Sequence, residues 1–362
     1  MAIYTIDQTL QVNDYYANVI KAVAYDRPLQ ATLKRGPVPE NWEQKIEVEG
    51  KVKTFNMAAP EGGDFNEAGL TGRKNAMMTC QLQKFRSQRG YSVTRETSML
   101  PGYTQKKGEK ELARQQRMDA EELTLSIERA LGSNQEAVER GTGATVPYTR
   151  GILNWLKKGG AHQVHPIPDV VKPGCGISGD ISSASVFSED IFKAELVKAA
   201  LEQGDSRLAL VGYCGLQLKL IMSNWLGRAT TVSGMDNIIR RTEPKAKSIE
   251  LICDEFTWDG VTARTLVDNH LNCTIGNVGA EIVQGTKSFY TGAFIRPEFW
   301  TIDTLEPLTA YDLEDKGAGP RGYHEAILRL ACRNPLGQFA VIDTTVDASS
   351  SSSSSSSGEA NA

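Results

Sequence analysis

The sequence predicts an α+β fold in which a long helix, an extended pair of strands and a compact α/β domain occupy successive parts of the chain. A long helix is predicted over 105–140, where apolar or small residues recur at three-, four- and seven-residue steps without proline. Strands are predicted over 46–57 and 78–94, where apolar and polar residues alternate with a period of two. From 188 onwards, short strand and helix patterns alternate, which is typical of an α/β domain.

The predicted long helix is the segment around which the rest of the chain is organised. At 1.5 Å per residue, a helix of roughly 25 to 30 residues spans about 40 Å, whereas globular helices average about 11 to 12 residues. We interpret it as a beam across one face of a thin domain; an ordinary surface helix of an α+β enzyme fits the length equally well. Its apolar face is expected to comprise Ala113, Ala120, Leu123, Ile127, Ala130 and Leu131.

The two strands that precede this helix are predicted to form a ribbon with no core of its own. In the second strand, Met78, Cys80 and Leu82 alternate with polar residues, so only one face is apolar. A two-stranded ribbon of this kind is marginally stable alone. We therefore expect the ribbon to be buried only against neighbouring subunits.

The α/β domain has clear local signals at its first helix. Ser188 is a typical N-cap, acidic residues follow it in the first turn, and Gly204 is a typical end of the helix. A strand pattern over 208–211 leads into a predicted helix over 216–226. Towards the end of the chain, 325–342 is predicted to form two short strands around a turn.

Composition excludes several classes of protein. The chain has 362 residues, of which 40% are hydrophobic, and can bury a sizeable core. A net charge of −4 argues against a dedicated nucleic-acid-binding protein, which would carry a strongly basic domain. No stretch approaches the ~20 apolar residues of a membrane span, and no signal-peptide pattern opens the chain, so we expect a cytoplasmic setting. Six cysteines without CxxC spacing indicate reduced, mostly buried thiols.

A search for catalytic or metal-binding motifs gives two weak candidates. Cys214 lies between a strand and a helix, as a nucleophile does in a hydrolase, but the glycine required two residues later is replaced by Leu216. His162, His165 and Cys175 lack the fourth ligand of a structural zinc site. We therefore expect no enzyme activity, no cofactor and no metal; a cytoplasmic hydrolase that uses Cys214 is the alternative.

Several short motifs occur in an order that resembles a known family. They are Ile127–Gln135 (IERALGSNQ), Gly151–Trp155 (GILNW), Leu210–Gly212 (LVG), Arg296–Trp300 (RPEFW) and Arg333–Asn334. Residues 1–39 contain one amphipathic segment and read as an arm rather than a domain. Together with this arm, the ribbon, the long helix and the α/β domain, the order of the motifs is similar to the HK97-like major capsid proteins of tailed phages. The resemblance covers nearly the whole chain.

The resemblance implies a major capsid protein that self-assembles into hexamers and pentamers of an icosahedral phage head enclosing double-stranded DNA. It implies assembly in the host cytoplasm and a final location in the virion capsid. The implied partners are further copies of the chain, scaffolding, portal and decoration proteins, and DNA held by non-specific contacts, with no membrane. Encapsulin compartments share this fold and are the alternative; an enzyme cargo in place of DNA would favour them. The implied division is an N-terminal arm at 1–39, an extended loop at 40–104, a peripheral domain with the spine helix at 105–187 and 320–347, and an axial domain at 188–319. The serine-rich residues 348–362 are not part of the family pattern, and their composition predicts a flexible tail.

Charge patterning suggests how subunits meet. The stretch from Leu70 to Arg95 contains no acidic residue, although the chain is net negative. Such a run is usually a solvated face. A ribbon without a core must dock, however, so we expect its basic strand to lie across the acidic outer face of a neighbouring subunit's long helix. The expected intersubunit contacts join Arg73, Lys74, Lys84, Arg86, Arg89 and Arg95 to Asp119, Glu121, Glu122 and Glu128.

Overall fold

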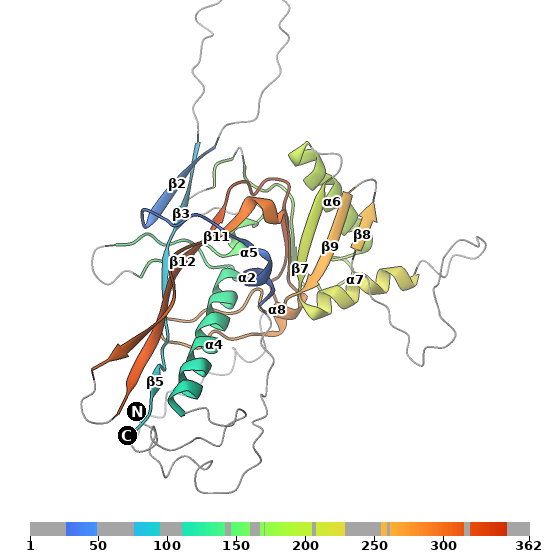
Figure 1. Ribbon diagram of the computed structural model, residues 1–362. Helices are drawn as coiled ribbons and strands as arrows, with labels where there is room; N and C mark the ends of the chain where they lie inside the picture. Colours follow the sequence, from blue (N-terminus) through green and yellow to red (C-terminus); the bar gives the residue numbers. More distant parts are fainter. Residues whose placement is uncertain are drawn as a thin grey trace, which may run out of the picture.

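The fold consists of two main β-sheets, each with helices packed on it, and a small two-stranded sheet (Figure 1). The structure is a computed structural model of the chain. The structure describes residues 27–48, 76–94, 111–141, 146–159, 167–169, 171–204, 208–228, 255–258, 261–314 and 319–345.

The first main sheet has five strands in the order β1-β11-β12-β4, with β5 also paired to β12. Its longest strands, β11 and β12, run antiparallel and extend away from the second sheet (Figure 1). Helix α4 packs along this sheet and contacts β12, β5 and β4. The bounds are β1 (Lys34–Arg35), β4 (Gln83–Arg86), β5 (Tyr91–Ser92), α4 (Glu111–Leu131), β11 (Trp300–Leu313) and β12 (Arg321–Cys332).

The predicted long helix is present as the 21-residue α4, and it ends where Gly132 interrupts the pattern. Its apolar face is partly as predicted. Leu123, Ile127 and Ala130 are buried in a core shared with the sheet, whereas Ala113 is exposed. The face that packs is therefore set by the aliphatic residues of the second half of the helix.

The second main sheet has six strands in the order β6-β13-β10-β7-β9-β8. Helices α6 and α7 pack on this sheet and form with it the second hydrophobic core of the subunit, which contains Phe192, Leu196, Leu218, Met222 and Phe294. Strands β7 and β9 are parallel, as in an α/β unit, while β10 runs antiparallel to both of its neighbours. The bounds are β6 (Ile177–Gly179), α6 (Glu189–Gln203), β7 (Ala209–Cys214), α7 (Leu216–Arg228), β8 (Glu255–Trp258), β9 (Val261–Val267), α8 (Thr286–Tyr290), β10 (Gly292–Ile295) and β13 (Phe339–Asp343).

The local signals of α6 are confirmed. The Ser188 hydroxyl accepts a hydrogen bond from the Ile191 amide, and acidic residues occupy the first turn. Gly204 ends the helix in the left-handed region, at φ 72°, where a side chain would be strained. The buried face is formed by Phe192, Leu196 and Ala199, at the spacing of one helix face.

The described part of the ribbon does not lack a core, contrary to our expectation. Strands β2 (Glu43–Val48) and β3 (Ala76–Gln81) pair with each other, but the chain then continues into β4, which pairs with β12. Met78, Cys80 and Leu82 are almost completely buried, and the first two join the core beneath α4. The apolar face is therefore covered within the subunit. The part of the expected loop between β2 and β3, residues 49–75, lies outside the described residues.

Two short links join the two main sheets. Residues 296–299, which include the 3₁₀ turn η4 (Pro297–Phe299), connect β10 to β11, and residues 333–338 connect β12 to β13. The buried Gln338 of the second link accepts a hydrogen bond from the Arg296 amide at 3.0 Å and another from the Trp300 indole at 2.6 Å. The two links are thus tied to each other.

Two expected divisions of the chain differ from this arrangement. A boundary at 319/320 separates β11 from β12, although these strands pair along their length, from Trp300–Cys332 to Leu313–Arg321. The two strands expected within 325–342 do not pair with each other, since β12 belongs to the first sheet and β13 to the second. Local alternation identifies a strand but does not identify its partner. The proposed serine-rich tail lies outside the described residues.

Candidate functional site

The basic residues of β4 contact a buried carboxylate of their own chain. Lys84 Nζ lies 2.5 Å from Glu325 Oε1, and Arg86 Nε lies 2.9 Å from Glu325 Oε2. Burial favours the neutral acid, but the hydrogen bonds from Lys84 and Arg86 outweigh it and hold the pKa of Glu325 below its ordinary value. Two cations share this carboxylate, and a second carboxylate on the same face, that of Glu306, accepts from the Tyr311 hydroxyl.

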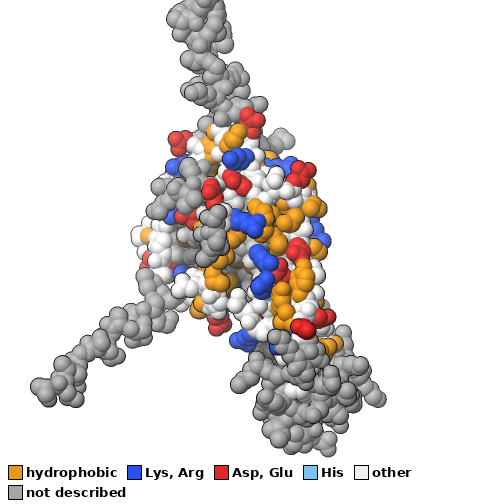
Figure 2. All heavy atoms as spheres, turned by 90° about the vertical axis from the view of Figure 1, so that its left-hand side faces the viewer, with side chains coloured by type: hydrophobic (Ala, Val, Ile, Leu, Met, Phe, Trp, Pro, Cys, Tyr) orange, Lys and Arg blue, Asp and Glu red, His pale blue; other side chains and the backbone are white. Residues whose placement is uncertain are grey.

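These side chains lie on the sheet face that points away from α4. The neighbouring His324 points towards α4, and alternation therefore puts Tyr323 and Glu325 on the opposite side. The Arg86 guanidinium lies 4.8 Å from the Tyr323 ring centroid, and Tyr323 stacks on Tyr311 at 5.6 Å. Figure 2 looks onto this side of the molecule and shows hydrophobic side chains beside Lys and Arg side chains.

The far half of β11 adds exposed apolar surface to this region. Strand β1 pairs with β11 only at Thr301 and Ile302, so the rest of β11 is an edge within the described part of the sheet. Pro307 lies in this edge and has no N–H for a further strand to bind. Register puts Tyr311 and Leu313 on the same face as Tyr323, while Leu305 and Leu308 lie at the two register shifts of the β11 edge. We call the combined surface of this face and edge the bare sheet face, and it comprises Lys84, Arg86, Tyr323 and the exposed Leu305, Leu308, Tyr311 and Leu313.

Two of the four acidic residues expected on the outer side of α4 are instead buried. Asp119 Oδ2 lies 2.7 Å from His324 Nδ1, and its other oxygen accepts from the Ser87 hydroxyl. Glu128 accepts from the amides of Leu29 at 2.7 Å and of Gln30 at 3.2 Å. Both carboxylates are satisfied within the subunit, which corrects the expectation that they face outward.

The other two acidic residues do lie at the surface of α4. Glu122 lies 3.8 Å from Arg89, and these side chains are 50% and 82% exposed. Glu121 pairs with Arg117 one turn away at 3.5 Å. Such exposed pairs contribute little to stability. They leave the outer α4 face, formed by Met118, Glu121 and Glu122, accessible to a partner.

The remaining basic residues of the expected contact, Arg73, Lys74 and Arg95, lie outside the described residues. Sequence reasoning missed Glu325, whose carboxylate organises the basic strand. It also missed the buried Arg329–Asp303 pair, whose Nε and Oδ2 atoms are 2.9 Å apart. The available signal was the presence of charged residues inside the otherwise apolar run of β12, because a charge within such a run needs a partner.

The structure gives no support to the catalytic alternative. Cys214 is completely buried, and burial raises the pKa of its thiol far above the ordinary value, which keeps it protonated. Within the described ranges, no group of three His, Cys, Asp or Glu residues is arranged to hold a metal. His162 and His165 fall outside those ranges. None of the described helices is both long and apolar enough to cross a membrane.

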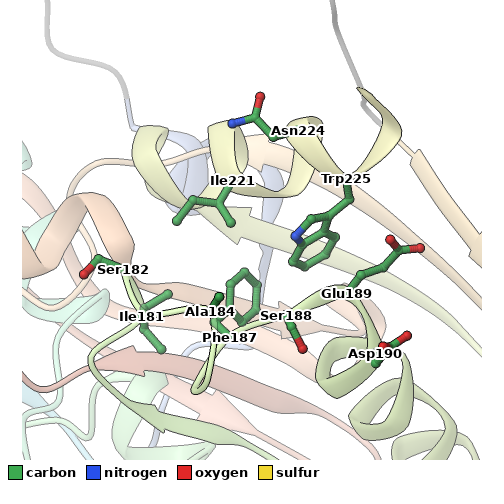
Figure 3. Close-up of a pocket in the computed structure, with 10 residues that line it drawn as sticks. All are labelled: Ile181, Ser182, Ala184, Phe187, Ser188, Glu189, Asp190, Ile221, Asn224 and Trp225. Atoms are coloured by element: carbon green, nitrogen blue, oxygen red, sulfur yellow. The ribbon is translucent and has the colours of Figure 1, made fainter. Parts of the chain in front are cut away.

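A pocket of about 340 Å³ lies between α7 and the start of α6 (Figure 3). Ile181, Phe187, Ile221 and Trp225 line it, with serine and acidic side chains around them. Phe187 and Trp225 are packed together, with ring centroids 5.1 Å apart, and belong to the core of the second sheet. The pocket is therefore an opening in the helical surface above an aromatic core, and the described residues that line it include serines but no histidine or cysteine.

Comparison with known proteins gives the same fold. The model of the family described as SU10 major capsid protein matches residues 2–345. No curated protein matches the chain in sequence. The capsid of cyanophage P-SCSP1u aligns with a TM-score of 0.55 at 8% identity, covering 92% of this chain and 93% of that one. The capsid of an empty GTA particle aligns with a TM-score of 0.54 at 10% identity, covering 94% of this chain and 98% of that one. The capsid of cyanophage A-1(L) aligns with a TM-score of 0.54 at 10% identity, covering 94% of this chain and 99% of that one.

The structural similarities have low sequence identity and show the fold, while the family match covers nearly the whole chain. The family match favours a phage capsid subunit over an encapsulin shell. A structural role follows from the family, and self-association into the capsomers of a virion shell follows from that role. The chain belongs to the SU10 major capsid protein family and has the HK97-like fold.

Proposed function

We propose that this major capsid protein forms hexamers and pentamers through a head-to-tail contact between the bare sheet face of one subunit and the outer α4 face of the next. The observation that carries the proposal is the group of exposed apolar residues on the edge strand β11: Leu305, Leu308, Tyr311 and Leu313. An edge of this kind is normally paired, covered or protected by charge. In a shell subunit, another copy is the partner that is always present.

The geometry supports a head-to-tail contact. The bare sheet face and α4 lie on opposite sides of the same sheet, so the two surfaces of one subunit face in different directions. A contact between two different surfaces repeats around an axis and closes into a ring. The exposed Lys84 and Arg86 side chains would meet Glu121 and Glu122 of the next subunit, while Met118 would meet apolar side chains. Each exposed ion pair contributes only ~0.2–1 kcal/mol, so the apolar contacts dominate.

Two variants test this contact. Leu308→Asp/Leu313→Asp changes the bare sheet face, and Met118→Lys/Glu122→Lys changes the outer α4 face. Each should abolish shell assembly while leaving the melting temperature of the subunit nearly unchanged, because all four side chains are exposed. Leu308→Met/Leu313→Met is the matched control and should assemble.

A mixture of the two variants gives a sharper result. Each variant keeps one intact surface, so an equal mixture should form dimers and no shells in sedimentation velocity at the concentration where the wild type assembles. Normal assembly of the Leu308→Asp/Leu313→Asp variant would show that the bare sheet face is not an interface. Failure of both variants with no dimers in the mixture would exclude the head-to-tail pairing.

We further propose that the shell is icosahedral, encloses double-stranded DNA through non-specific contacts, and assembles in the host cytoplasm with scaffolding, portal and decoration proteins. These are the partners expected of a phage head with this fold. The role is structural rather than catalytic. Electron microscopy of purified particles, combined with an assay for nuclease-protected DNA, tests this proposal; an enzyme cargo without DNA would contradict it.

We also propose domain boundaries that follow the sheets. The five-stranded sheet with α4 would be the peripheral domain, and the six-stranded sheet with α6 and α7 the axial domain. Strand β11 then belongs to the peripheral domain and β13 to the axial domain. Deletions that follow these boundaries should yield more soluble protein than deletions at 319/320, which divide the β11–β12 pair.

A further inference from the structure

The short helix α2 (Pro28–Thr32) is held at the meeting point of α4 and the second sheet. Glu128 of α4 accepts hydrogen bonds from the amides of Leu29 and Gln30. The Gln30 side chain also donates to the Thr124 carbonyl of α4 at 2.9 Å. On the other side of α2, the hydroxyl of Thr32 contacts that of Tyr213 in β7. The start of the described chain is therefore fastened to two different elements.

Glu128 occupies a costly position for a charged group. Its side chain is completely buried, and its hydrogen bonds come from the α2 amides rather than from a bound cation. The titratable groups that face it are Arg27, at the start of α2, and Tyr213, on β7. Arg129, its neighbour on α4, instead donates to the Ile282 carbonyl. An ionised carboxylate here loses much of its hydration when α2 covers it.

We propose that Glu128 and α2 form a pH-dependent latch, which holds the base of the N-terminal segment against α4 and β7 at low pH and loosens as the pH rises. The latch goes beyond the assembly proposed above, and it would control whether α2 stays attached to the body of the subunit.

The direction of the effect follows from linkage. Burial raises the pKa of Glu128 from 4.5 to about 7, although the amides of Leu29 and Gln30 act to lower it. When α2 leaves, water reaches the carboxylate and its pKa returns towards the ordinary value. The latched state therefore binds a proton more tightly than the open state. The free-energy advantage of the latched state over the open state is complete below pH 4.5 and is lost as the pH rises through 7. With these values, the opening constant grows on the order of fifty-fold between pH 5 and 8.

Hydrogen exchange of unassembled full-length subunits tests the latch independently of the proposed interface. The readout is the exchange rate of the Leu29 and Gln30 amides in the wild type divided by that in Glu128→Gln, at each pH from 5 to 8. The division removes the intrinsic pH dependence of exchange. The glutamine side chain of Glu128→Gln cannot ionise, so the ratio of the wild-type rate to the variant rate should rise several tens of fold between pH 5 and 8. Glu122→Gln is the matched control on the exposed surface of α4 and should follow the wild type.

A second variant keeps the test decisive if Glu128→Gln does not fold. Thr32→Val removes the contact with Tyr213 without changing the carboxylate. It should speed exchange by a similar factor at every pH and leave the pH dependence of the wild type intact. A wild-type rate that, after correction for intrinsic exchange, stays constant between pH 5 and 8 would overturn the proposal. So would a Glu128→Gln variant with the same pH dependence as the wild type.

Discussion

Asp119 and His324 join the long helix to the middle of the first sheet, with Asp119 Oδ2 lying 2.7 Å from His324 Nδ1. The same carboxylate accepts from the Ser87 hydroxyl, and the Ser87 amide donates to the His324 carbonyl at 2.9 Å. The turn between β4 and β5, the helix α4 and the strand β12 thus meet at one buried polar cluster. Its partners depend on one another, because Asp119 and His324 are buried away from water and Ser87 is half-buried beside them.

Removing this carboxylate should be strongly destabilising. We expect Asp119→Ala to lower the free energy of unfolding by about 3 kcal/mol, since His324 and Ser87 lose their partner in a buried site. Glu122→Ala, three residues along the same helix but exposed, should change it by less than about 0.5 kcal/mol. Urea unfolding of unassembled subunits measures both. Equal effects would show that the cluster does not stabilise the fold.

The Arg329–Asp303 pair should show strong coupling. Both side chains are almost fully buried, and Asp303 also accepts from the Thr301 hydroxyl at 2.9 Å. Arg329→Met leaves the carboxylate without its cation and should cost about 3–5 kcal/mol. Asp303→Leu/Arg329→Met removes both charges and should recover most of that loss. A double-mutant cycle in urea measures the coupling, and additive effects would contradict it.

The packing of α4 predicts a contrast between two alanines on the same helix. Ala130 is buried in the core under α4, so Ala130→Leu should overfill that contact and cost about 1–3 kcal/mol. Ala113 is exposed, and Ala113→Leu should be nearly neutral. Thermal melting of subunits distinguishes the two. An unchanged melting temperature for Ala130→Leu would mean that the helix can move away from the sheet at little cost.

The glycine in the Leu210–Gly212 motif has a packing reason. A Cβ at Gly212 would lie 2.5 Å from the Phe294 ring, which is itself stacked on Phe339 at 4.9 Å and has little room to move. We therefore expect Gly212→Ala to cost about 1–3 kcal/mol. Gly204→Ala, which meets no atom within 4 Å but has φ +72°, should cost only about 1 kcal/mol. Denaturant midpoints with equal slopes would test the order; a smaller loss for Gly212→Ala would contradict it.

The features that could be predicted from the sequence depend on residues close together in the chain. Helix α6 is an example, since its cap, its first turn and its final glycine all lie within 17 residues. The long helix was predicted for the same reason; it ends at Leu131, before Gly132, rather than continuing to Arg140. The resemblance to capsid proteins rested on the order of several short motifs, and the family match confirms the resemblance.

The candidate site was less predictable because its partners are distant in the chain. Periodicity places Asp119 and Glu128 among charged residues and so indicates an outer face. Their partners, His324 and Leu29, lie 205 and 99 residues away. Contacts with residues so distant in the chain can bury charged side chains that the local sequence pattern places on the exposed face of a helix. The alternation of β12 and β13 likewise could not reveal that they join different sheets.

The tied links between the two sheets have a mechanical consequence. Besides the long connection from α4 to β6, a force that pulls the six-stranded sheet away from the other passes through residues 296–299 and 333–338 at the same time. Because Gln338 in one link holds Arg296 in the other, neither can extend or twist alone. Two parallel tethers share a load and resist torsion far better than a single one. The subunit should therefore respond to tension as one rigid lever, and the curvature of the container should be set by angles between subunits rather than by bending within them.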